Sequence, residues 1–382
     1  MKNLTNLYIG LMSGTSIDGI DVALVDFCEN NCPLIASYAH PIANELKLRI
    51  SNLSSALTIK QTDDIRRIEL MAQVDVEMGH VFADAVNKLL TNNNLDSEQI
   101  SAIGSHGQTI RHRPNQSFPF SLQLGDANII AEKTGITTIA DFRRADIAAG
   151  GQGAPLAPAF HNAFLRCGQE NRVILNLGGI ANITYLPQDK SCEVIGFDTG
   201  TANTLLDAWF TKTNPSCAID YDIDSNFAQK GQVNLVLLEA MLSDPYFALS
   251  SPKSTGREYF CLDWLKQHLT KIIQPISNED VQRTLLELTT ETIANEISKL
   301  GTSSAQVYAC GGGMHNRFLI ENLSDKLNRD VHTTNDLSFD GDYLEAMTFA
   351  WLAKRRLENK PGNLPSVTGS KKEKRLGAIY LA

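Results

Sequence analysis

Two stretches of the chain place short apolar runs on either side of a compact polar turn. The first, "LYIGLMSGTSIDGIDVALVDF", covers residues 7–27, and the second, "RVILNLGGIANITYLP", covers residues 172–187. Short apolar runs bounded by turn residues predict strands, so each stretch is expected to form a β-hairpin. Each hairpin pattern opens a section of similar length. This long-range repeat predicts two related α/β domains.

Apolar positions recur at helical spacing in other segments. Residues 61–90 and 343–357 are each expected to form a helix. A third helix is expected after Ser277, because the polar cap "SNED" precedes an apolar stripe there. Residues 100–104 are expected to be a strand that enters a polar loop, "GSHGQTIRHRP".

Glycine and proline interrupt residues 142–161 so often that this segment is predicted to be a loop or a hinge. The chain has 382 residues, which is more than one hydrophobic core usually supports. We therefore predict a first domain of residues 1–145 with about 346–382, and a second domain of residues 146–345.

Composition narrows the possible partners. The formal net charge of -9 argues against nucleic acid or an acidic membrane surface as the main partner. No apolar run approaches the roughly 20 residues of a membrane-spanning helix, and no secretory leader precedes the first strand. The seven cysteines are scattered, which fits reduced thiols in a cytoplasmic protein better than a disulfide framework.

The first polar turn carries the strongest candidate chemistry. It lacks both the Walker phosphate-loop pattern and the dinucleotide fingerprint. Its backbone amides and short hydroxyl side chains nevertheless suit phosphate oxygens, and the Asp18 carboxylate suits a phosphate-bound Mg2+. Alternatively, these are ordinary turn residues. The candidate phosphate-binding residues are Ser13, Gly14, Thr15, Ser16, Ile17, Asp18, Gly19 and Ile20.

Two further glycine turns could contact a ligand. Gly178 and Gly179 form the turn of the second hairpin pattern, although Gly-Gly is also ordinary hairpin chemistry. Gly311, Gly312 and Gly313 follow the expected strand "QVYA" and precede a helix pattern. Glycines there allow a flat ligand to approach the backbone, but a tight strand-to-helix turn needs them equally.

The three turns, in this order, resemble the two phosphate turns and the adenosine turn of the sugar kinase, actin and heat-shock chaperone ATPase superfamily. Longer strings make the resemblance more specific. These strings are similar to the anhydro-N-acetylmuramic acid kinases over essentially the whole chain. They are "GLMSGTSIDGIDVALVDF", "IGSHGQTIRH", "ADFRRADIAAGGQGAPLAPAFH", "LNLGGIANIT", "GFDTGTAN", "PKSTGREYF", "CGGGMHN" and "EAMTFAWLA".

The resemblance implies an α/β fold of two duplicated actin/sugar-kinase-like (ribonuclease H-like) domains, with mixed sheets flanked by helices and an inter-domain cleft. It implies an enzyme that uses ATP, Mg2+ and water to convert 1,6-anhydro-N-acetylmuramic acid into N-acetylmuramic acid 6-phosphate. Such an enzyme would act in cytoplasmic peptidoglycan recycling. The resemblance also suggests a homodimer.

The family's general base lies in the motif "GFDTGTAN", which points to Asp198. From the residues alone, Asp198 could equally be the N-cap of the following helix. Arg143 and Arg144 could bind the sugar's lactyl carboxylate, with the resemblance favouring Arg144, or could pair with Asp141 or Asp146.

His106, Gln108 and Thr109 are expected to line the cleft, with His106 donating or accepting hydrogen bonds rather than acting as a base. Glu345 begins a helix and could reach the substrate, although an acidic first-turn residue also suits the helix dipole. No role follows from the sequence for Lys253 or Arg257 of the "PKSTGREYF" string.

Three other functions remain open at this point. A chaperone- or actin-like ATPase would use the nucleotide only to change shape and would not need Asp198. A hydrolase that opens the anhydro bond would not need three nucleotide turns. A sugar-sensing module would not turn over ATP.

Overall fold

The computed structural model describes residues 6–14, 16–28, 32–54, 64–301 and 304–382. The chain forms two compact units, Met1–Phe164 with Tyr343–Ala382 and Leu165–Asp342. Residues 146–164, which the sequence analysis placed in the second domain, pack in the first unit. Phe160 and Phe164 lie against the Trp351 ring at centroid distances of 6.1 and 6.5 Å, which ties this segment to the C-terminal part of the first unit.

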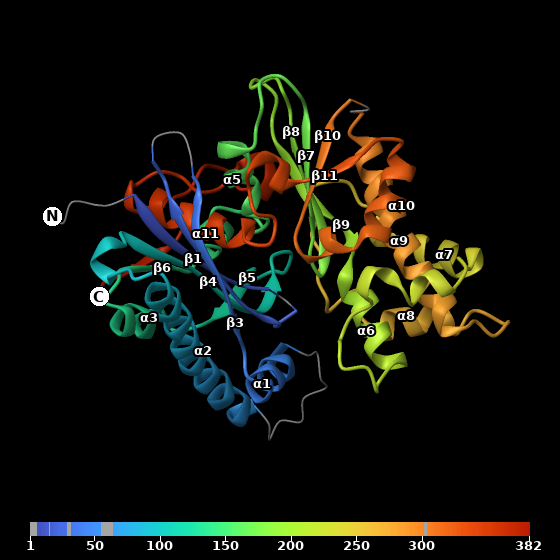
Figure 1. Ribbon diagram of the computed structural model, residues 1–382, viewed down its shortest axis with the longest axis horizontal. Helices are drawn as coiled ribbons and strands as arrows, with labels where there is room; N and C mark the ends of the chain where they lie inside the picture. The colour runs from blue at the N-terminus through green and yellow to red at the C-terminus, as the bar shows by residue number, and fades with distance from the viewer. Residues whose placement is uncertain (1–5, 15, 29–31, 55–63, 302–303) are drawn as a thin grey trace. The chain divides into compact units, whose positions relative to one another are not determined.

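The first unit is built on a mixed sheet with the strand order β12-β6-β4-β1-β2-β3, and β5 pairs with β4 (Figure 1). Its strands β1, β2 and β3 are antiparallel neighbours, whereas β4 runs parallel to β1 and to β6. The strands are β1 (Leu7–Ser13), β2 (Gly19–Asp26), β3 (Leu34–Pro41), β4 (Ala102–Arg113), β5 (Phe120–Leu124), β6 (Thr138–Ala140) and β12 (Ala378–Tyr380).

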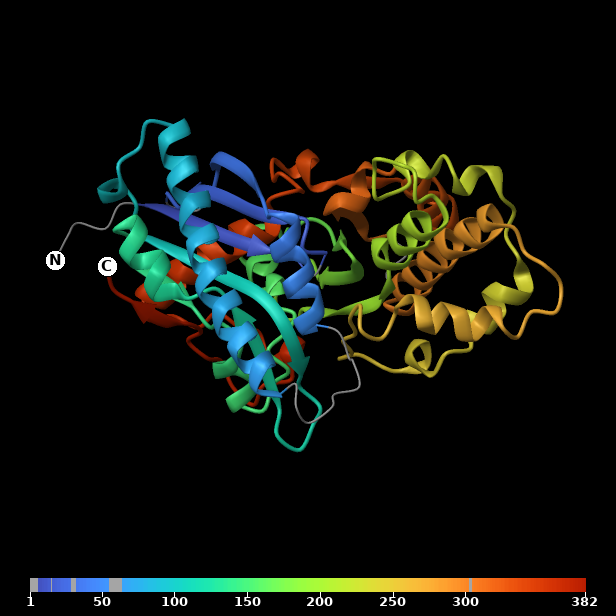
Figure 2. The same cartoon turned by 90° about the horizontal axis from the view of Figure 1, so that it is seen from below.

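Alternation along β1 decides which helices cover which face of this sheet. Ile9 and Leu11 lie in one core with the apolar face of α2. Gly10 faces the other way, where an added Cβ would lie 1.8 Å from the Ala346 carbonyl oxygen of α11, so only glycine allows that close packing. Helices α2 and α11 therefore cover opposite faces (Figure 1, Figure 2). The helices are α1 (Asn44–Ser54), α2 (Asp64–Asn92), α3 (Ala127–Thr134), α4 (Arg144–Ala148), α5 (Ala157–Phe164), α11 (Leu344–Leu357) and α12 (Pro365–Thr368).

The second unit repeats this topology with the strand order β11-β10-β7-β8-β9. Strands β7, β8 and β9 are antiparallel neighbours, and β10 runs parallel to β7 and to β11. The predicted duplication is thereby confirmed for five strands of each sheet, whereas β5 and β12 have no counterpart among the described residues of the second unit. The strands are β7 (Arg172–Leu177), β8 (Ile180–Leu186), β9 (Ile195–Thr201), β10 (Gln306–Cys310) and β11 (Val331–Thr333).

Helices pack on the second sheet around a core that contains Val173, Leu175 and Leu177 of β7. The helices are α6 (Asn203–Thr213), α7 (Leu235–Leu242), α8 (Leu262–Leu269), α9 (Asn278–Lys299) and α10 (Arg317–Leu327), together with the short 3-10 helices η5 (Pro245–Ala248) and η6 (Gly312–His315). Ser277 caps α9 as predicted, because its side chain accepts the Asp280 N–H at 3.0 Å. Across the described ranges, no helix combines the length and the apolarity that crossing a membrane requires.

Two sequence predictions need correction. The polar segment after residue 104 is not a loop but the continuation of β4, which pairs with β5 through Arg113. Several of its polar side chains are accommodated by polar side chains of other segments, as Gln108 is by Ser13 at 2.7 Å and Thr109 is by Gln123 at 3.1 Å. The segment 142–161 is not wholly irregular, since α4 and the first part of α5 occupy half of it.

Candidate active site

The turn between β1 and β2 is braced by buried polar side chains. The Ser13 hydroxyl lies 2.7 Å from Gln108 Oε1 and 3.1 Å from the Gly19 carbonyl oxygen, and its single proton serves one of them at a time. Gln108 Nε2 donates to the Gly14 carbonyl at 3.2 Å. Both side chains are 1% exposed. Ser13 and Gln108 therefore hold the turn in shape, which leaves little of either side chain for a ligand.

In the turn between β1 and β2, polar side chains are exposed and apolar side chains pack into the core. Ile17 and Ile20 are buried in the core of the first unit, so only their backbones could contact a ligand. Ile17 has a φ of 63°, a left-handed conformation that costs energy for a β-branched residue and is typical of functional turns. Ser16 and Asp18 are exposed, and Thr15 lies outside the described residues.

His106 belongs to a buried polar cluster in the first unit. Arg143 Nη2 lies 2.7 Å from His106 Nε2, and Arg143 Nη1 donates to the Gly153 carbonyl at 2.8 Å. Burial, and then the Arg143 charge, lower the pKa of His106 well below its usual value. The ring is therefore neutral and accepts the Arg143 proton, which makes His106 unsuited to act as a base and fits the predicted hydrogen-bonding role.

The two adjacent arginines have different surroundings. The Arg143 side chain is directed into the cluster with His106, whereas the Arg144 side chain is 66% exposed and its Nε lies 2.7 Å from Asp141 Oδ1. Part of the alternative interpretation, pairing with Asp141, is therefore correct for Arg144. Such an exposed pair adds little stability, so Arg144 remains available to exchange Asp141 for another carboxylate.

Thr109 and Glu345 lie in the same unit. Thr109 Oγ1 accepts a hydrogen bond from Gln123 Nε2 at 3.1 Å on neighbouring strand β5. Glu345 lies in the first turn of α11 and is partly buried. Burial raises the pKa of its carboxyl, and the nearby Arg143 charge opposes that rise. Glu345 is thus electrostatically coupled to the His106–Arg143 cluster.

In the second unit, Asp198 is held at three of its atoms. Its N–H donates to the Lys253 carbonyl at 3.1 Å, and its own carbonyl accepts the Tyr246 hydroxyl at 2.7 Å. The Thr255 N–H donates to Asp198 Oδ2 at 2.9 Å. Burial and the Asp198 charge raise the pKa of Tyr246, so its hydroxyl stays protonated. The carboxylate therefore has one oxygen fixed by a backbone donor.

Asp198 lies at an irregularity of β9. The pairing of β8 with β9 shifts between Ala181, opposite Gly200, and Asn182, opposite Asp198, so Thr199 is an extra residue. Such bulges redirect side chains and are common beside active sites. The alternative interpretation of Asp198 as a helix N-cap is wrong, because Ala202 occupies the N-cap of α6.

The Gly178–Gly179 turn is tied to the start of α6. The Gly179 carbonyl accepts the N–H groups of Ala202 and Thr204 at 3.0 and 3.1 Å, and the Gly178 carbonyl accepts that of Asn203 at 3.1 Å. These bonds satisfy amides that a helix start leaves without partners. The turn is therefore fixed in position by the helix that follows β9.

In the third glycine turn, packing against the rest of the protein explains two of the three glycines but not Gly312. A Cβ at Gly311 would lie 2.4 Å from Asn176 Oδ1, and one at Gly313 would lie 2.6 Å from the Leu177 Cβ. At Gly312 a Cβ would meet no described atom within 4 Å. Gly311 and Gly313 are thus required by packing, whereas Gly312 leaves open backbone.

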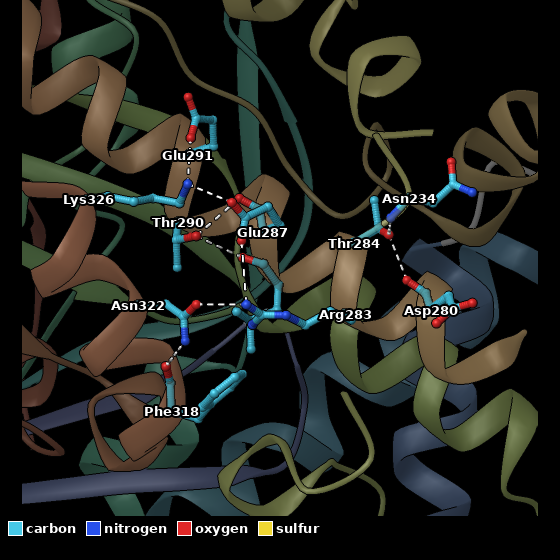
Figure 3. Close-up of polar contacts among 11 residues, drawn as sticks. Asn234, Asp280, Arg283, Thr284, Glu287, Thr290, Glu291, Phe318, Asn322 and Lys326 are labelled. Atoms are coloured by element: carbon cyan, nitrogen blue, oxygen red, sulfur yellow. Dashed lines mark hydrogen bonds and ion pairs between the residues drawn. The ribbon is translucent and has the colours of Figure 1, made fainter. Parts of the chain in front are cut away.

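The helix that follows this turn, α10, is fastened to α9 by charged side chains (Figure 3). Lys326 Nζ lies 2.6 Å from Glu287 Oε1 and 2.7 Å from Glu291 Oε2. Arg283 Nη2 donates to Asn322 Oδ1 at 2.9 Å. A network of this kind fixes the register of the two helices, and so fixes the turn that leads into α10.

Sequence reasoning missed several residues around Asp198. Three of them, Tyr246, Lys253 and Thr255, form hydrogen bonds with Asp198. The fourth, Glu296, accepts a hydrogen bond from Lys253 Nζ through its Oε1 at 3.1 Å. The only signal for them was the string "PKSTGREYF", which contains Lys253 and Thr255 but did not by itself indicate a role. Nothing in the spacing of Tyr246 or Glu296 pointed to this site.

The repeated topology, with a polar turn after the first strand of each sheet, defines an α/β protein of the actin and sugar kinase fold class. The chain matches the family anhydro-N-acetylmuramic acid kinase over residues 6–382, and it belongs to that family.

Curated relatives agree with this assignment. Anhydro-N-acetylmuramic acid kinase of Coxiella burnetii (strain Dugway 5J108-111) is 50% identical over 98% of this chain and 97% of its own length. The protein of the same name in Pasteurella multocida (strain Pm70) is 47% identical over 100% of this chain and 98% of its own. Among solved structures, xylulose kinase from Rhodospirillum rubrum covers 98% of this chain and 94% of its own, at 13% identity and a TM-score of 0.43, too distant a likeness to bear on function.

Proposed function

We propose that this protein is an ATP-dependent kinase that opens 1,6-anhydro-N-acetylmuramic acid with water and phosphorylates its O6. The products would be N-acetylmuramic acid 6-phosphate and ADP. Membership of the anhydro-N-acetylmuramic acid kinase family over residues 6–382 supports the substrate. The observation that carries the chemistry is the position of Asp198, whose backbone and one carboxylate oxygen are held by three neighbours.

Asp198 would act as the general base. Its carboxylate takes a proton from a water molecule, and the water oxygen forms a bond to the anomeric carbon as the bond from that carbon to the bridging oxygen breaks. The released O6 then bonds to the γ-phosphorus of ATP while the bond to the β-phosphate oxygen breaks. The Thr255 N–H, which donates to Asp198 Oδ2 at 2.9 Å, would hold the carboxylate in a fixed orientation toward the water.

Each unit carries its own candidate groups for binding ATP. In the first, the exposed Ser16 hydroxyl and the backbone of the turn from Ser13 to Ile20 would bind phosphate oxygens. In the second, the Gly178–Gly179 turn would contribute backbone donors, and the open backbone at Gly312 would accommodate the nucleoside.

The donor set also fits Mg2+. Within the described ranges, no group of three or more His, Cys, Asp or Glu side chains could form a protein-only metal site. Mg2+ that accompanies a nucleotide usually needs only one or two carboxylates, since phosphates and waters complete its shell. Asp18, exposed on the first turn, would hold it, and the ion would neutralise charge on the phosphates.

The sugar would be bound by the first unit's polar groups as well. Arg144, whose exposed side chain pairs only with Asp141 among the ion pairs of the described residues, would bind the lactyl carboxylate. Thr109, Glu345 and the His106–Arg143 cluster would line the sugar site. A role in cytoplasmic peptidoglycan recycling and a homodimeric state belong to the same proposal.

A product assay in 18O-labelled water tests this function. Protein, Mg-ATP and the anhydro sugar should give one ADP and one 6-phosphosugar per turnover, with solvent oxygen at C1 in the mass spectrum. A nucleotide-switch ATPase would hydrolyse ATP at the same rate without sugar. A hydrolase would give unphosphorylated N-acetylmuramic acid. Either result would refute the kinase proposal.

A further inference from the structure

We propose that Lys253 is a positioning residue that sets the direction of the Asp198 carboxylate through the main chain. The inference rests on the proposed function, in which Asp198 is the general base. Lys253 is 4% exposed, so its ammonium group is enclosed by protein atoms. Any influence on the reaction must therefore pass through the residues that Lys253 contacts.

The backbone around Lys253 forms the support of Asp198. The Lys253 carbonyl accepts the Asp198 N–H at 3.1 Å, and two residues later the Thr255 N–H donates to Asp198 Oδ2 at 2.9 Å. One short stretch, residues 253–255, thus holds both the backbone and a carboxylate oxygen of the base. A displacement of this stretch would rotate or release the carboxylate.

The Lys253 side chain fixes that stretch from within the core. Its Nζ lies 3.1 Å from Glu296 Oε1 on α9, 5.1 Å from the centroid of the Tyr246 ring and 5.8 Å from that of Phe197. Phe197 precedes Asp198 in β9, and the Tyr246 hydroxyl donates to the Asp198 carbonyl. Two of the three groups around the ammonium group, the Phe197 and Tyr246 rings, therefore belong to residues that adjoin Asp198.

Stability alone does not account for a lysine at this place. A buried ion pair loses hydration on folding, and apolar side chains of similar volume are often as stable or more stable. Glu296 also has a second cation, because Lys299 Nζ lies 2.8 Å from the same Oε1 and its side chain is 60% exposed. Neutralising Glu296 thus does not require Lys253. What distinguishes Lys253 from Lys299 is that Lys253 belongs to the stretch 253–255, which is hydrogen-bonded to Asp198.

Lys299 provides a matched control. Lys253→Met and Lys299→Met each remove one ammonium group from Glu296 Oε1, but only the first alters the stretch 253–255. We expect Lys253→Met to lower kcat about 100-fold, because small displacements of a catalytic group have effects of that size. The KM for ATP and the ATP affinity measured by calorimetry should stay within about twofold, since the variant removes no group that is proposed to bind ATP. Lys299→Met should leave kcat within about twofold of the wild type.

A second variant covers the case in which Lys253→Met folds poorly. Lys253→Met with Glu296→Leu removes both buried charges and should recover the thermal midpoint of unfolding. Its kcat should stay low, because two apolar side chains do not restore the directional contacts of the ammonium group. Recovery of wild-type kcat in this double variant would mean that packing alone supports Asp198, and would overturn the inference.

Asp198→Asn, assayed in parallel, separates the two proposals. If Asp198→Asn is inactive while Lys253→Met keeps kcat within about threefold of the wild type, the positioning role is overturned and the proposed function stands. If Asp198→Asn retains full turnover, the base is wrongly assigned and the inference falls with it. A Lys253→Met protein that loses ATP affinity in proportion to kcat would show a merely structural role and would also overturn the inference.

Discussion

The third strand of each sheet occupies the same place in the repeated topology, yet the two strands differ in surroundings. In β3, partly buried and exposed positions alternate regularly from Leu34 to Pro41. In β9, five of seven residues are buried, and the strand carries the bulge beside Asp198. The segment containing Lys253 bonds to β9 at Asp198, whereas β3 shows the simple pattern of a strand with one solvated face. The two strands thus share a topology but differ in cover, and under the proposed function only the more covered strand, β9, carries the general base.

The largest effect is expected at Asp198 of β9, the proposed general base. Asp198→Asn should lower kcat by about 1,000-fold, within the range for losing a general base, because an amide cannot take the proton of water. Calorimetric ATP affinity should be unchanged. Asp325→Asn, an exposed carboxylate on α10, is the control and should behave as wild type. Near-normal turnover by Asp198→Asn would show that β9 does not hold the base.

The next effect concerns the glycine turn of the second unit. Gly312→Val should raise the KM for ATP about tenfold, because the added side chain would occupy open space assigned to the nucleoside rather than any space used by the fold. Gly168→Val is the matched control, since a Cβ there also meets nothing within 4 Å. Steady-state kinetics with varied ATP measures the difference. Equal KM values for the two variants would show that the nucleoside does not bind at this turn.

A stability effect is expected in the first unit, where the buried carboxylate is structural. Asp146 Oδ1 accepts hydrogen bonds from Asn363 Nδ2 and Thr368 Oγ1 at 2.6 and 2.8 Å, and its Oδ2 accepts the Gly153 N–H at 2.8 Å. Asp146→Asn would direct an amide N–H at one of these donors and should cost about 2 kcal/mol of unfolding free energy. Urea denaturation measures this change. An unchanged midpoint would contradict the structural assignment.

The smallest effect is a pH dependence of the first unit. Burial lowers the pKa of His161, on α5, to about 3, below its value in the unfolded chain. The unfolded chain therefore binds a proton that the folded protein excludes, and stability falls as the pH drops below about 6.5. His161→Leu should reduce the drop in thermal midpoint between pH 7 and pH 5. If the thermal midpoint of the variant dropped between pH 7 and pH 5 by as much as that of the wild type, His161 would not be the group that stays unprotonated in the folded protein.

The fold was predictable because it rests on periodicity. Apolar runs around the turns at residues 14–18 and 178–179 predicted both hairpins and their duplication. The Ser277 cap predicted the start of α9. The segment 105–113 was mispredicted because its polar residues suggested a loop. Ser13 and Gln108 satisfy each other's hydrogen bonds across 95 positions of sequence, which no local pattern reveals.

The candidate site was predictable only where a motif contains the residue that matters. Asp198 lies in such a string, and its alternative role as a cap was excluded by the position of Ala202. Tyr246 and Glu296 lie 48 and 43 positions from the residues they contact. Their roles come from packing in three dimensions, so a single sequence gives no direct signal for them.

The first unit is made from two separated parts of the chain, Met1–Phe164 and Tyr343–Ala382, with the second unit between them. Helix α11 comes from the later part and covers the face of β1 where Gly10 allows its close approach. During translation, which releases the chain from its N-terminus, that face has no helix to cover it until α11 has been made. The second unit is complete in sequence before that point. The inserted unit can therefore finish folding before the unit that surrounds it in sequence, and the nascent chain exposes an apolar sheet face throughout that interval.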